Sequence, residues 1–107
     1  MTALPRTMVE KILSRTSGGA PVRAGDDIRA RPDFVLAYDF PGYTNVIFDQ
    51  IRTHFGGRPP PDPERFAIFI DHMVPADRPG EVAFHDQTRQ SCRELGIACI
   101  EDEGIGH

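Results

Sequence analysis

Residues able to carry out acid–base chemistry follow the apolar runs of this sequence, where each run ends. Asp39 follows the run 34–38, Asp71 and His72 follow the run 66–70, and His107 lies in the loop after the run 97–100. If these runs are parallel strands, their carboxyl ends meet at one edge of a sheet, where open α/β sheets bind ligands. Carboxylates and histidines gathered there can transfer protons or bind a metal ion. The pattern therefore favours a site at that edge.

Each of these residues also has a structural interpretation. Asp39 precedes an expected helix and is equally suited to cap it, Asp71 is suited to cap a turn, and His72 is suited to a solvated loop. The other histidines, His54 and His85, fall on expected helices away from the strand ends. We expect surface or packing roles for those two.

The two cysteines, Cys92 and Cys99, are expected on the inward face of a helix and within a strand. Their spacing on different elements matches no metal-ligand motif. We expect both to behave as small buried hydrophobic residues, and no metal ligands are assigned. Two cysteines of this kind fit a reduced, intracellular protein better than a secreted protein held by a disulfide.

The hydrophobic pattern predicts a helix over 7–15, with Thr7 as its N-cap, Glu10 at the capping-box spacing and the glycines 18–19 at its end. Met8, Ile12 and Leu13 share one face, and this short stripe needs a larger body to pack against.

Three apolar runs, 34–38, 66–70 and 97–100, predict buried parallel strands. Between them, helices are expected over 43–55 and 80–95, the second ending at Gly96. The residues expected to face inward are Val46, Ile47, Ile51 and Phe55 on the first of these helices, and Phe84, Thr88, Cys92 and Leu95 on the second.

Strands that alternate with helices indicate an α/β fold with a parallel sheet, here part of a three-layer αβα arrangement. The segment 56–63 is dense in glycine and proline and is expected to be an irregular loop within a single domain, 1–107. Three strands with two helices leave a sheet edge and a sheet face uncovered. We therefore expect a truncated chain or one that needs a partner.

The composition excludes several classes of protein. The net charge is −4, and the basic residues are scattered, which argues against a nucleic-acid-binding surface. No apolar stretch approaches the length of a membrane span, and the N-terminus lacks the apolar core of a signal peptide. A cytoplasmic location is expected.

Four segments together resemble a known family. Residues 7–13 are similar to T-x-x-E-K-I-L, residues 22–26 to V-x-P-G-(D/E), residues 69–75 to x-x-D-H-x-V-P, and residues 104–107 to G-I-x-H. These motifs occur in this order in the large subunits of aconitase-type dehydratases, in particular 3-isopropylmalate dehydratase. The chain thus resembles the N-terminal part of an aconitase-type domain.

The resemblance implies a [4Fe–4S] hydro-lyase or isomerase that dehydrates and rehydrates a small hydroxy di- or tricarboxylic acid. It implies catalytic roles for Asp71, His72 and His107: Asp71 holds the imidazole of His72, this pair helps to protonate the departing oxygen, and His107 bonds a carboxylate further along the chain. It also implies a small swivelling-domain subunit as partner. The cluster cysteines of the family lie beyond position 107, so this chain by itself is expected to bind no cluster and to be inactive.

The sequence departs from the family pattern near Asp39. Relatives often read H-(D/E)-V-T where this chain has Tyr38-Asp39-Phe40-Pro41. We expect Tyr38 and Asp39 to bind substrate, since a tyrosine hydroxyl donates a hydrogen bond to a carboxylate. The change favours a hydratase for a substituted malate or maleate.

Two other hypotheses remain open from the sequence. One is a stand-alone, non-catalytic α/β module that pairs with another subunit. The other is a small metal-binding protein that uses Asp39, Asp71, His72 and His107.

Overall fold

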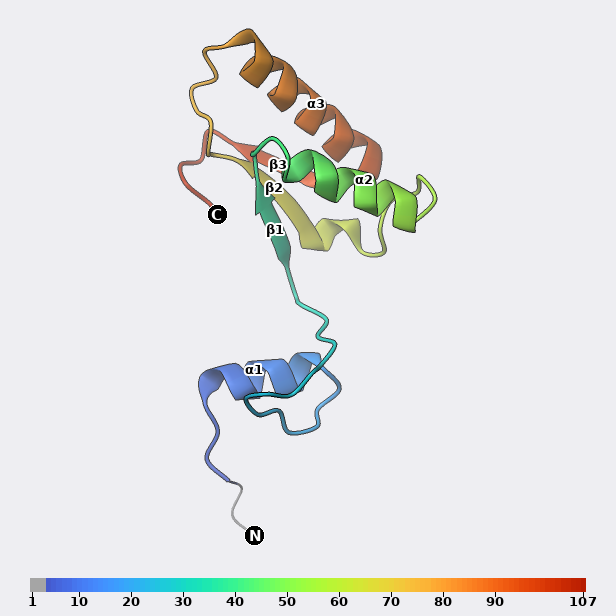
Figure 1. Ribbon diagram of the computed structural model, residues 1–107, viewed down its shortest axis with the longest axis vertical. Coiled ribbons are helices and arrows are strands. Elements are labelled where there is room, and N and C mark those ends of the chain that lie inside the picture. The colour runs from blue at the N-terminus through green and yellow to red at the C-terminus, as the bar shows by residue number, and fades with distance from the viewer. Residues whose placement is uncertain (1–3) are drawn as a thin grey trace. The chain divides into compact units, whose positions relative to one another are not determined.

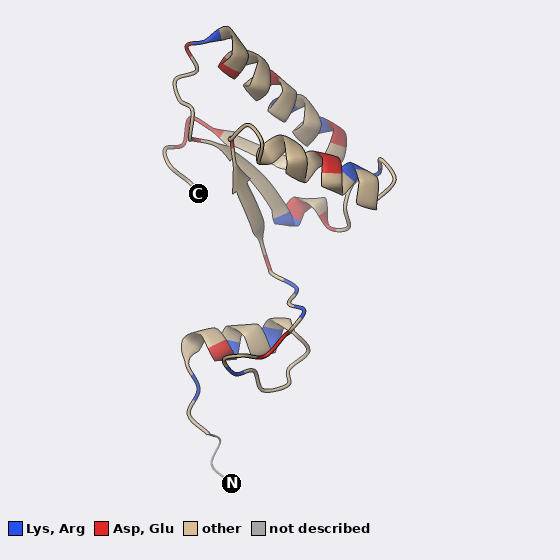
Figure 2. Cartoon of the chain, in the orientation of Figure 1, with Lys and Arg blue, Asp and Glu red and all other residues tan. Residues whose placement is uncertain are grey.

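A computed structural model describes residues 4–107. Its elements, in chain order, are α1 (Met8–Thr16), β1 (Val35–Tyr38), α2 (Thr44–His54), the 3-10 helix η1 (Pro63–Arg65), β2 (Phe66–Ile70), α3 (Pro79–Leu95) and β3 (Ala98–Glu101). The chain falls into two compact units, Met1–Asp33 and Phe34–His107. Charged residues lie mainly on the helices and loops, and the strands carry almost none (Figure 2).

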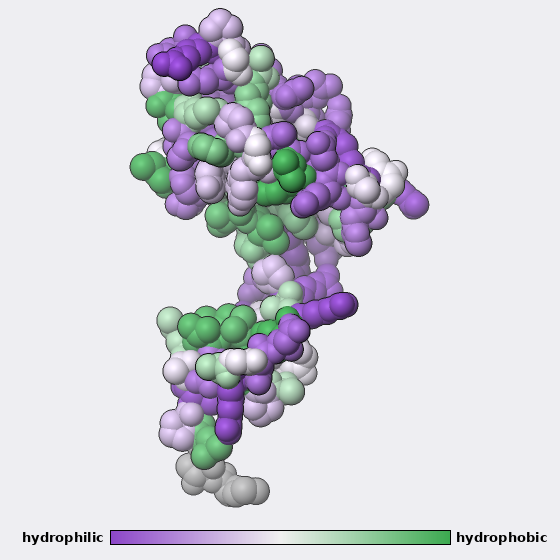
Figure 3. Space-filling view, in the orientation of Figure 1, coloured by the Kyte–Doolittle hydropathy of each residue, from purple (hydrophilic) through white to green (hydrophobic). Residues whose placement is uncertain are grey.

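The first unit contains α1, and the expected capping box is confirmed. The Thr7 hydroxyl accepts a hydrogen bond from the Glu10 N–H at 3.1 Å, and the Glu10 carboxylate accepts one from the Thr7 N–H at 2.9 Å. From within the helix, the Ser14 hydroxyl donates to the carbonyl of Ala20, which lies beyond the helix end, at 2.8 Å. The apolar stripe of α1 remains largely open, with Met8 73% and Ile12 47% exposed, and apolar surface lies along the helix in Figure 3.

The second unit is built on a three-stranded, all-parallel sheet in the order β1-β2-β3 (Figure 1). The α/β fold class predicted from the sequence is confirmed. Strand β2 occupies the predicted range 66–70, and β1 and β3 each begin one residue later than predicted. Strand β1 was expected to be buried, but it is only partly so. It lies at the sheet edge, where Leu36 is 50% exposed.

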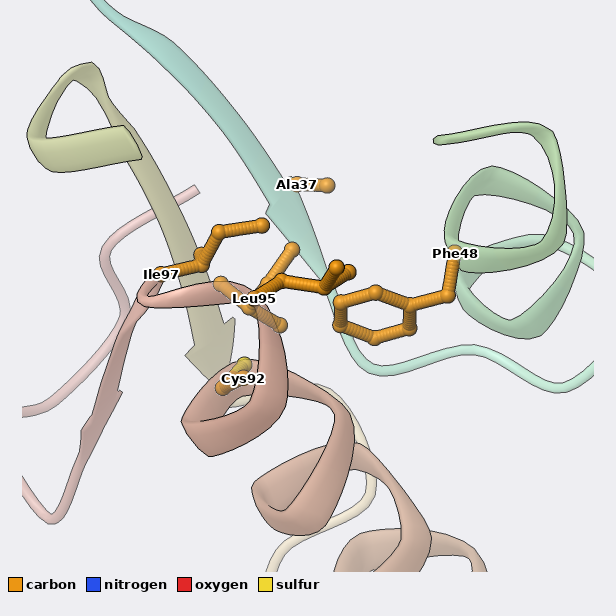
Figure 4. Packing of buried hydrophobic residues seen from close by; sticks show 6 residues of the cluster. Ala37, Phe48, Cys92, Leu95 and Ile97 are labelled. Carbon is orange, nitrogen blue, oxygen red and sulfur yellow. The ribbon is translucent and has the colours of Figure 1, made fainter. Parts of the chain in front are cut away.

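Helices α2 and α3 contact each other and pack on one face of this sheet. Ala37, Ile68 and Cys99 lie opposite one another in the register and define the covered face. The buried cluster on that face combines residues from strands and both helices: Ala37, Phe48, Ile68, Cys92, Leu95 and Ile97, each at most 5% exposed (Figure 4). This core fixes the helices over the sheet and leaves the carboxyl ends of the strands accessible.

The inward face of α2 matches the prediction in part, since Ile47 and Ile51 pack against the core as expected. Phe48 and Thr44 are buried, whereas Val46, predicted to face inward, is 42% exposed. The reason lies in the turn after β1, where the Thr44 hydroxyl accepts a hydrogen bond from the Phe40 N–H at 2.9 Å and donates one to the Tyr38 carbonyl. These bonds set the rotation of α2 from its first residue.

The inward face of α3 is closer to the prediction. Thr88, Cys92 and Leu95 are buried as expected, and Gly96 ends the helix in the left-handed conformation, with φ of 69°. Phe84 is only half-buried, and His85 takes the buried position beside it. Within residues 4–107, none of the helices combines the length and apolar character that a membrane crossing needs.

The opposite face of the sheet is covered by no helix of this unit. It carries Leu36, Tyr38, Phe69 and Ile100, the residues that alternate with the core positions. The C-terminal segment crosses the carboxyl end of this face, where Gly106 lies directly on the ring of Phe69. A Cβ atom on Gly106 would stand 2.0 Å from the Cδ1 atom of that ring.

Candidate active site

Asp39, directly after β1, is the most buried acid of the site, with no exposed surface. Its Oδ1 atom accepts hydrogen bonds from the N–H groups of Asp71 at 2.9 Å and His72 at 2.7 Å. Its Oδ2 atom accepts a third from the Met73 N–H at 3.0 Å. The carboxylate thus holds the loop after β2. It does not cap α2, and its burial indicates a positioning role; its contact with a substrate stays a prediction.

His85 completes the coordination of Asp39. Its Nε2 atom lies 2.7 Å from Asp39 Oδ2, and the residue is only 2% exposed. The expectation that His85 lies away from the strand ends is wrong, because α3 carries its side chain to the end of β1. A signal for this was present in the sequence: His85 precedes the inward residues Thr88 and Cys92 by one and two helical turns.

The hydrogen bonds at Asp39 favour its ionised form. Burial raises the pKa of this carboxyl, but the N–H groups of Met73, His72 and Asp71 and the ring of His85 outweigh burial. The net result is a pKa below the usual range of an aspartate.

Asp71, after β2, holds the next loop in the same manner. Its Oδ2 atom accepts hydrogen bonds from the N–H groups of Gly106 at 2.6 Å and His107 at 3.0 Å. Its Oδ1 atom lies 2.7 Å from Nδ1 of the His107 imidazole. Burial raises the pKa of Asp71, but these three hydrogen bonds and the nearby imidazole bring it below the usual range.

This geometry differs from the pairing inferred from the resemblance. Asp71 was expected to orient His72, and His107 was expected to bond a carboxylate further along the chain. Instead, the carboxylate of Asp71 bonds His107. The reason is the direction of the side chains: Asp71 points toward the loop after β3, whereas the ring of His72 lies beside Tyr38 and Phe40. With Nδ1 bound to Asp71 as a donor, Nε2 of His107 is left to face a ligand.

His72 is exposed and makes no hydrogen bond through its ring to the part of the chain that the structure describes. Its ring lies 5.2 Å from that of Phe40, edge to face, and 5.3 Å from that of Tyr38. Tyr38 in turn stacks on His107 at 4.3 Å and on Tyr43 at 4.9 Å. Aromatic packing therefore sets the position of His72 and leaves both of its nitrogens open to a ligand.

The structure thus brings Tyr38, Asp71, His72 and His107 together at one edge of the sheet and places Asp39 beneath them. The groups that can donate or accept protons are the two imidazoles, which are exposed, and the phenol of the half-buried Tyr38. The buried groups are two carboxylates that fix the backbone under the imidazoles. This arrangement suits binding of a small polar ligand together with acid–base chemistry on it.

A metal site is not formed by these side chains. In residues 4–107, no group of three or more histidine, cysteine, aspartate or glutamate side chains is arranged to hold a metal ion. The cysteines lie elsewhere: Cys92 is 1% exposed within the core, and Cys99 packs against that core from β3 (Figure 4). The hydrogen bond with Cys99 and burial both raise the pKa of the Cys92 thiol.

No family model matches the chain. It is 35% identical over 100 residues to a probable methanogen homoaconitase large subunit of Methanothermobacter thermautotrophicus, a match that covers 92% of this chain and 23% of that protein. It is 36% identical over 104 residues to a 3-isopropylmalate dehydratase large subunit of Methanopyrus kandleri, covering 95% of this chain and 24% of that protein.

A third relative, a probable 3-isopropylmalate dehydratase large subunit of Methanosarcina mazei, is 35% identical over 103 residues, covering 94% of this chain and 24% of that protein. The fold and the site define a class, that of parallel α/β proteins with acid–base residues beyond the strand ends. Within this class, the chain belongs to the aconitase family, with the large subunits of 3-isopropylmalate dehydratase and homoaconitase. It spans about a quarter of the length of the curated relatives it matches.

Proposed function

We propose that this chain supplies part of the active site of an aconitase-type hydro-lyase, which removes water from a small hydroxy di- or tricarboxylic acid and adds it back. The observation that carries the proposal is the Asp71–His107 pair, with 2.7 Å between Oδ1 and Nδ1, beside the exposed ring of His72. Membership of the dehydratase family supports the same reaction class.

In this proposal the imidazoles act on the substrate and the carboxylates act on the imidazoles. Dehydration needs a proton delivered to the departing hydroxyl group, and His72 is the exposed group suited to deliver it. Asp71 keeps the proton of His107 on Nδ1, so that the opposite nitrogen of this ring meets the substrate. The Tyr38 hydroxyl is suited to donate a hydrogen bond to a substrate carboxylate.

The [4Fe–4S] cluster expected for the family does not fit the residues of this chain. Such clusters are held by cysteine thiolates, and Cys92 and Cys99 lie in the core on the helix-covered side of the sheet. We propose that the complete enzyme takes its cluster ligands from outside residues 1–107, and that a small swivelling-domain subunit and a cytoplasmic location belong to the same assembly.

The names of the relatives and the aromatic residues of the site support a substrate class. The relatives are named homoaconitase and 3-isopropylmalate dehydratase large subunits, and both names refer to acids with at least two carboxyl groups. Tyr38, Phe40 and Tyr43 give the site an aromatic wall. We propose a substituted malate, formed by hydration of the corresponding maleate.

The test is an activity assay on the protein expressed from its complete gene and purified without oxygen, together with its small subunit. Hydration of isopropylmaleate, methylmaleate, maleate and homoaconitate is followed by the loss of ultraviolet absorbance of the unsaturated acid. Replacing His72 by Gln is expected to lower kcat by about 10²–10⁴-fold, the usual contribution of a general acid. His54→Gln, on α2 and outside the site, is the matched control and is expected to retain full activity. Activity of His72→Gln equal to the control would contradict the proposal.

A second candidate is a non-catalytic module that pairs with another subunit, and the uncovered sheet face favours it. Leu36 is 50% and Phe34 is 63% exposed, which leaves apolar surface for a partner. This candidate predicts that the small subunit binds the chain equally well in wild type and in His72→Gln, with no hydration of any of the four acids.

A further inference from the structure

We propose that His85 is a positioning residue of this site: from α3 it holds, through Asp39, the loop that carries His72 and the Asp71–His107 pair. Its importance for catalysis rests on the proposed function, whereas the contacts themselves do not. No motif of the sequence assigns His85 a role.

His85 and Asp39 form a buried hydrogen bond. The imidazole Nε2 lies 2.7 Å from Asp39 Oδ2, with the side chains 3% and 0% exposed. A carboxylate without access to water depends on hydrogen-bond donors for its charge to be stable. Three of its donors are backbone N–H groups, and His85 is the one side-chain donor in the described part of the chain.

Hydrogen bonds connect Asp39 to the exposed imidazoles. The Asp39 carboxylate bonds the N–H groups of three consecutive residues, Asp71, His72 and Met73. The carboxylate of Asp71 then bonds the backbone and the ring of His107. A shift of Asp39 therefore changes the placement of the His72 backbone and of the carboxylate that orients His107.

When His85 is removed, Asp39 needs another hydrogen-bond donor. A cavity of about 520 Å³ lies against His85, lined also by Val74, Val82, Arg89 and Glu101. Arg89 is bound to Glu101 at 2.8 and 2.9 Å, so its guanidinium is already engaged. Without His85, Asp39 loses its side-chain donor, and it can take up a proton, draw its partners toward this cavity or bond water that enters there. The first two changes weaken the bonds to the loop after β2, and water holds the carboxylate less rigidly than the buried imidazole does.

The experiment uses ¹⁵N-labelled chain and three substitutions of His85. In His85→Gln, the amide nitrogen reaches the place of Nε2 and donates to Asp39. In His85→Asn the same group falls short, and in His85→Leu it is absent. Thr88→Ala, one turn further along α3, is the matched control for general loss of stability, since its hydroxyl bonds only the Phe84 carbonyl of its own helix.

Two readouts follow the site and not the overall fold. The first is the tautomer of His107, read from long-range ¹H–¹⁵N couplings of its ring. The second is the exchange of the amide protons of Asp71, His72 and Met73. In His85→Leu and His85→Asn, we expect exchange at least about tenfold faster than in wild type, as for loss of one charge-assisted hydrogen bond, and a mixture of His107 tautomers. His85→Gln is expected to restore both readouts, and Thr88→Ala to leave the tautomer unchanged.

The outcomes separate this inference from the proposed function. If His85→Asn retains the wild-type tautomer and exchange rates, the positioning role is overturned, and the proposed function is untouched because no turnover was measured. If His85→Gln and Thr88→Ala disturb the site as much as His85→Asn, His85 acts through packing alone and the inference also fails. Should His85→Leu not fold, the comparison of Gln with Asn still decides, because these two side chains differ by one methylene group.

Discussion

Replacement of Asp39 by asparagine isolates the contribution of the buried carboxylate. The amide oxygen of the introduced side chain would still accept hydrogen bonds from the N–H groups of Asp71 and His72, but its NH₂ group would meet the N–H of Met73 where Oδ2 now accepts one at 3.0 Å. A buried donor that loses its acceptor costs about 1–3 kcal/mol. The remaining bonds would also lose the assistance of the negative charge, which roughly halves their strength. We therefore expect Asp39→Asn to lower the free energy of unfolding by about 2–4 kcal/mol.

Asp39→Ala is expected to be more severe. It leaves the N–H groups of Asp71, His72 and Met73 and the ring of His85 without acceptors, at about 1–3 kcal/mol each. The sum approaches the whole stability of a small domain, about 5–15 kcal/mol, so this variant should not fold. Asp49→Asn is the control: its side chain is 75% exposed, and a change below about 0.5 kcal/mol is expected.

The pH dependence gives an independent check. The pKa of Asp39 is lower in the folded state than in the unfolded chain, where it is about 3.9. The carboxylate therefore stabilises the fold fully above that value, and its contribution is lost as the pH falls further toward the folded-state pKa. Wild type and Asp39→Asn should thus differ most near pH 7 and converge in acid. Asp71 is present in both proteins, so its own titration cancels in the difference.

The measurement is urea unfolding followed by far-ultraviolet circular dichroism and by tyrosine fluorescence. The chain has no tryptophan, and its two tyrosines, Tyr38 and Tyr43, stack on each other at the site, so fluorescence reports this edge of the sheet directly. A loss below about 1 kcal/mol for Asp39→Asn at pH 7, or a difference from wild type that grows in acid, would refute the reasoning.

Three further changes test other parts of the fold. Glu101→Gln breaks the two-bond contact with Arg89 that joins β3 to α3. Because these groups are about a third exposed, we expect the free energy of unfolding in urea to fall by about 1 kcal/mol, and by less at high salt. A loss that does not depend on salt would contradict this. Thr7→Ala removes the capping box of α1 and should cost about 1 kcal/mol of helix stability, seen as reduced helical circular dichroism that Thr7→Ser restores. Gly96→Ala places a side chain at φ of 69° and should destabilise the fold by about 1 kcal/mol or more. The control Gly80→Ala, at a helical position with open space around it, should be neutral or stabilising by up to about 1 kcal/mol. Equal effects of the two substitutions in thermal melts would count against the backbone explanation.

The elements of the fold were predictable because their signals are local. The run 66–70 predicts β2 to the residue, and the spacing of Thr7 and Glu10 predicts the capping box that the structure contains. The position of β1 at the edge of the sheet was not predictable, since an apolar run reads the same in a central strand. The burial of Thr44 and Phe48 on α2 was missed for a related reason. The rotation of this helix is set by the side-chain bonds of Thr44 to the preceding turn, and hydrophobic periodicity does not record them.

The residues that meet at the site were predictable from topology, but their partners were not. Parallel strands in chain order place Asp39, Asp71 and His107 at one edge, as the alternation of strands and helices implies. The choice of His107 as partner of Asp71, and of His85 as partner of Asp39, depends on which way each side chain leaves the backbone. These contacts join residues 36 and 46 positions apart, and no local pattern in the sequence determines them.

One rule connects the two buried acids. Each aspartate at the end of a strand binds backbone N–H groups of the loop that follows the next strand: Asp39 binds residues 71–73, and Asp71 binds residues 106–107. The rule follows from the strand order, since the end of each strand lies beside the end of its successor, and irregular loops there present N–H groups without sheet partners. The two aspartates therefore fix the backbone that carries the exposed imidazoles of His72 and His107. Substitutions at the two acids should consequently change stability and imidazole placement together, whereas substitutions at His72 should change chemistry and leave stability almost unaltered.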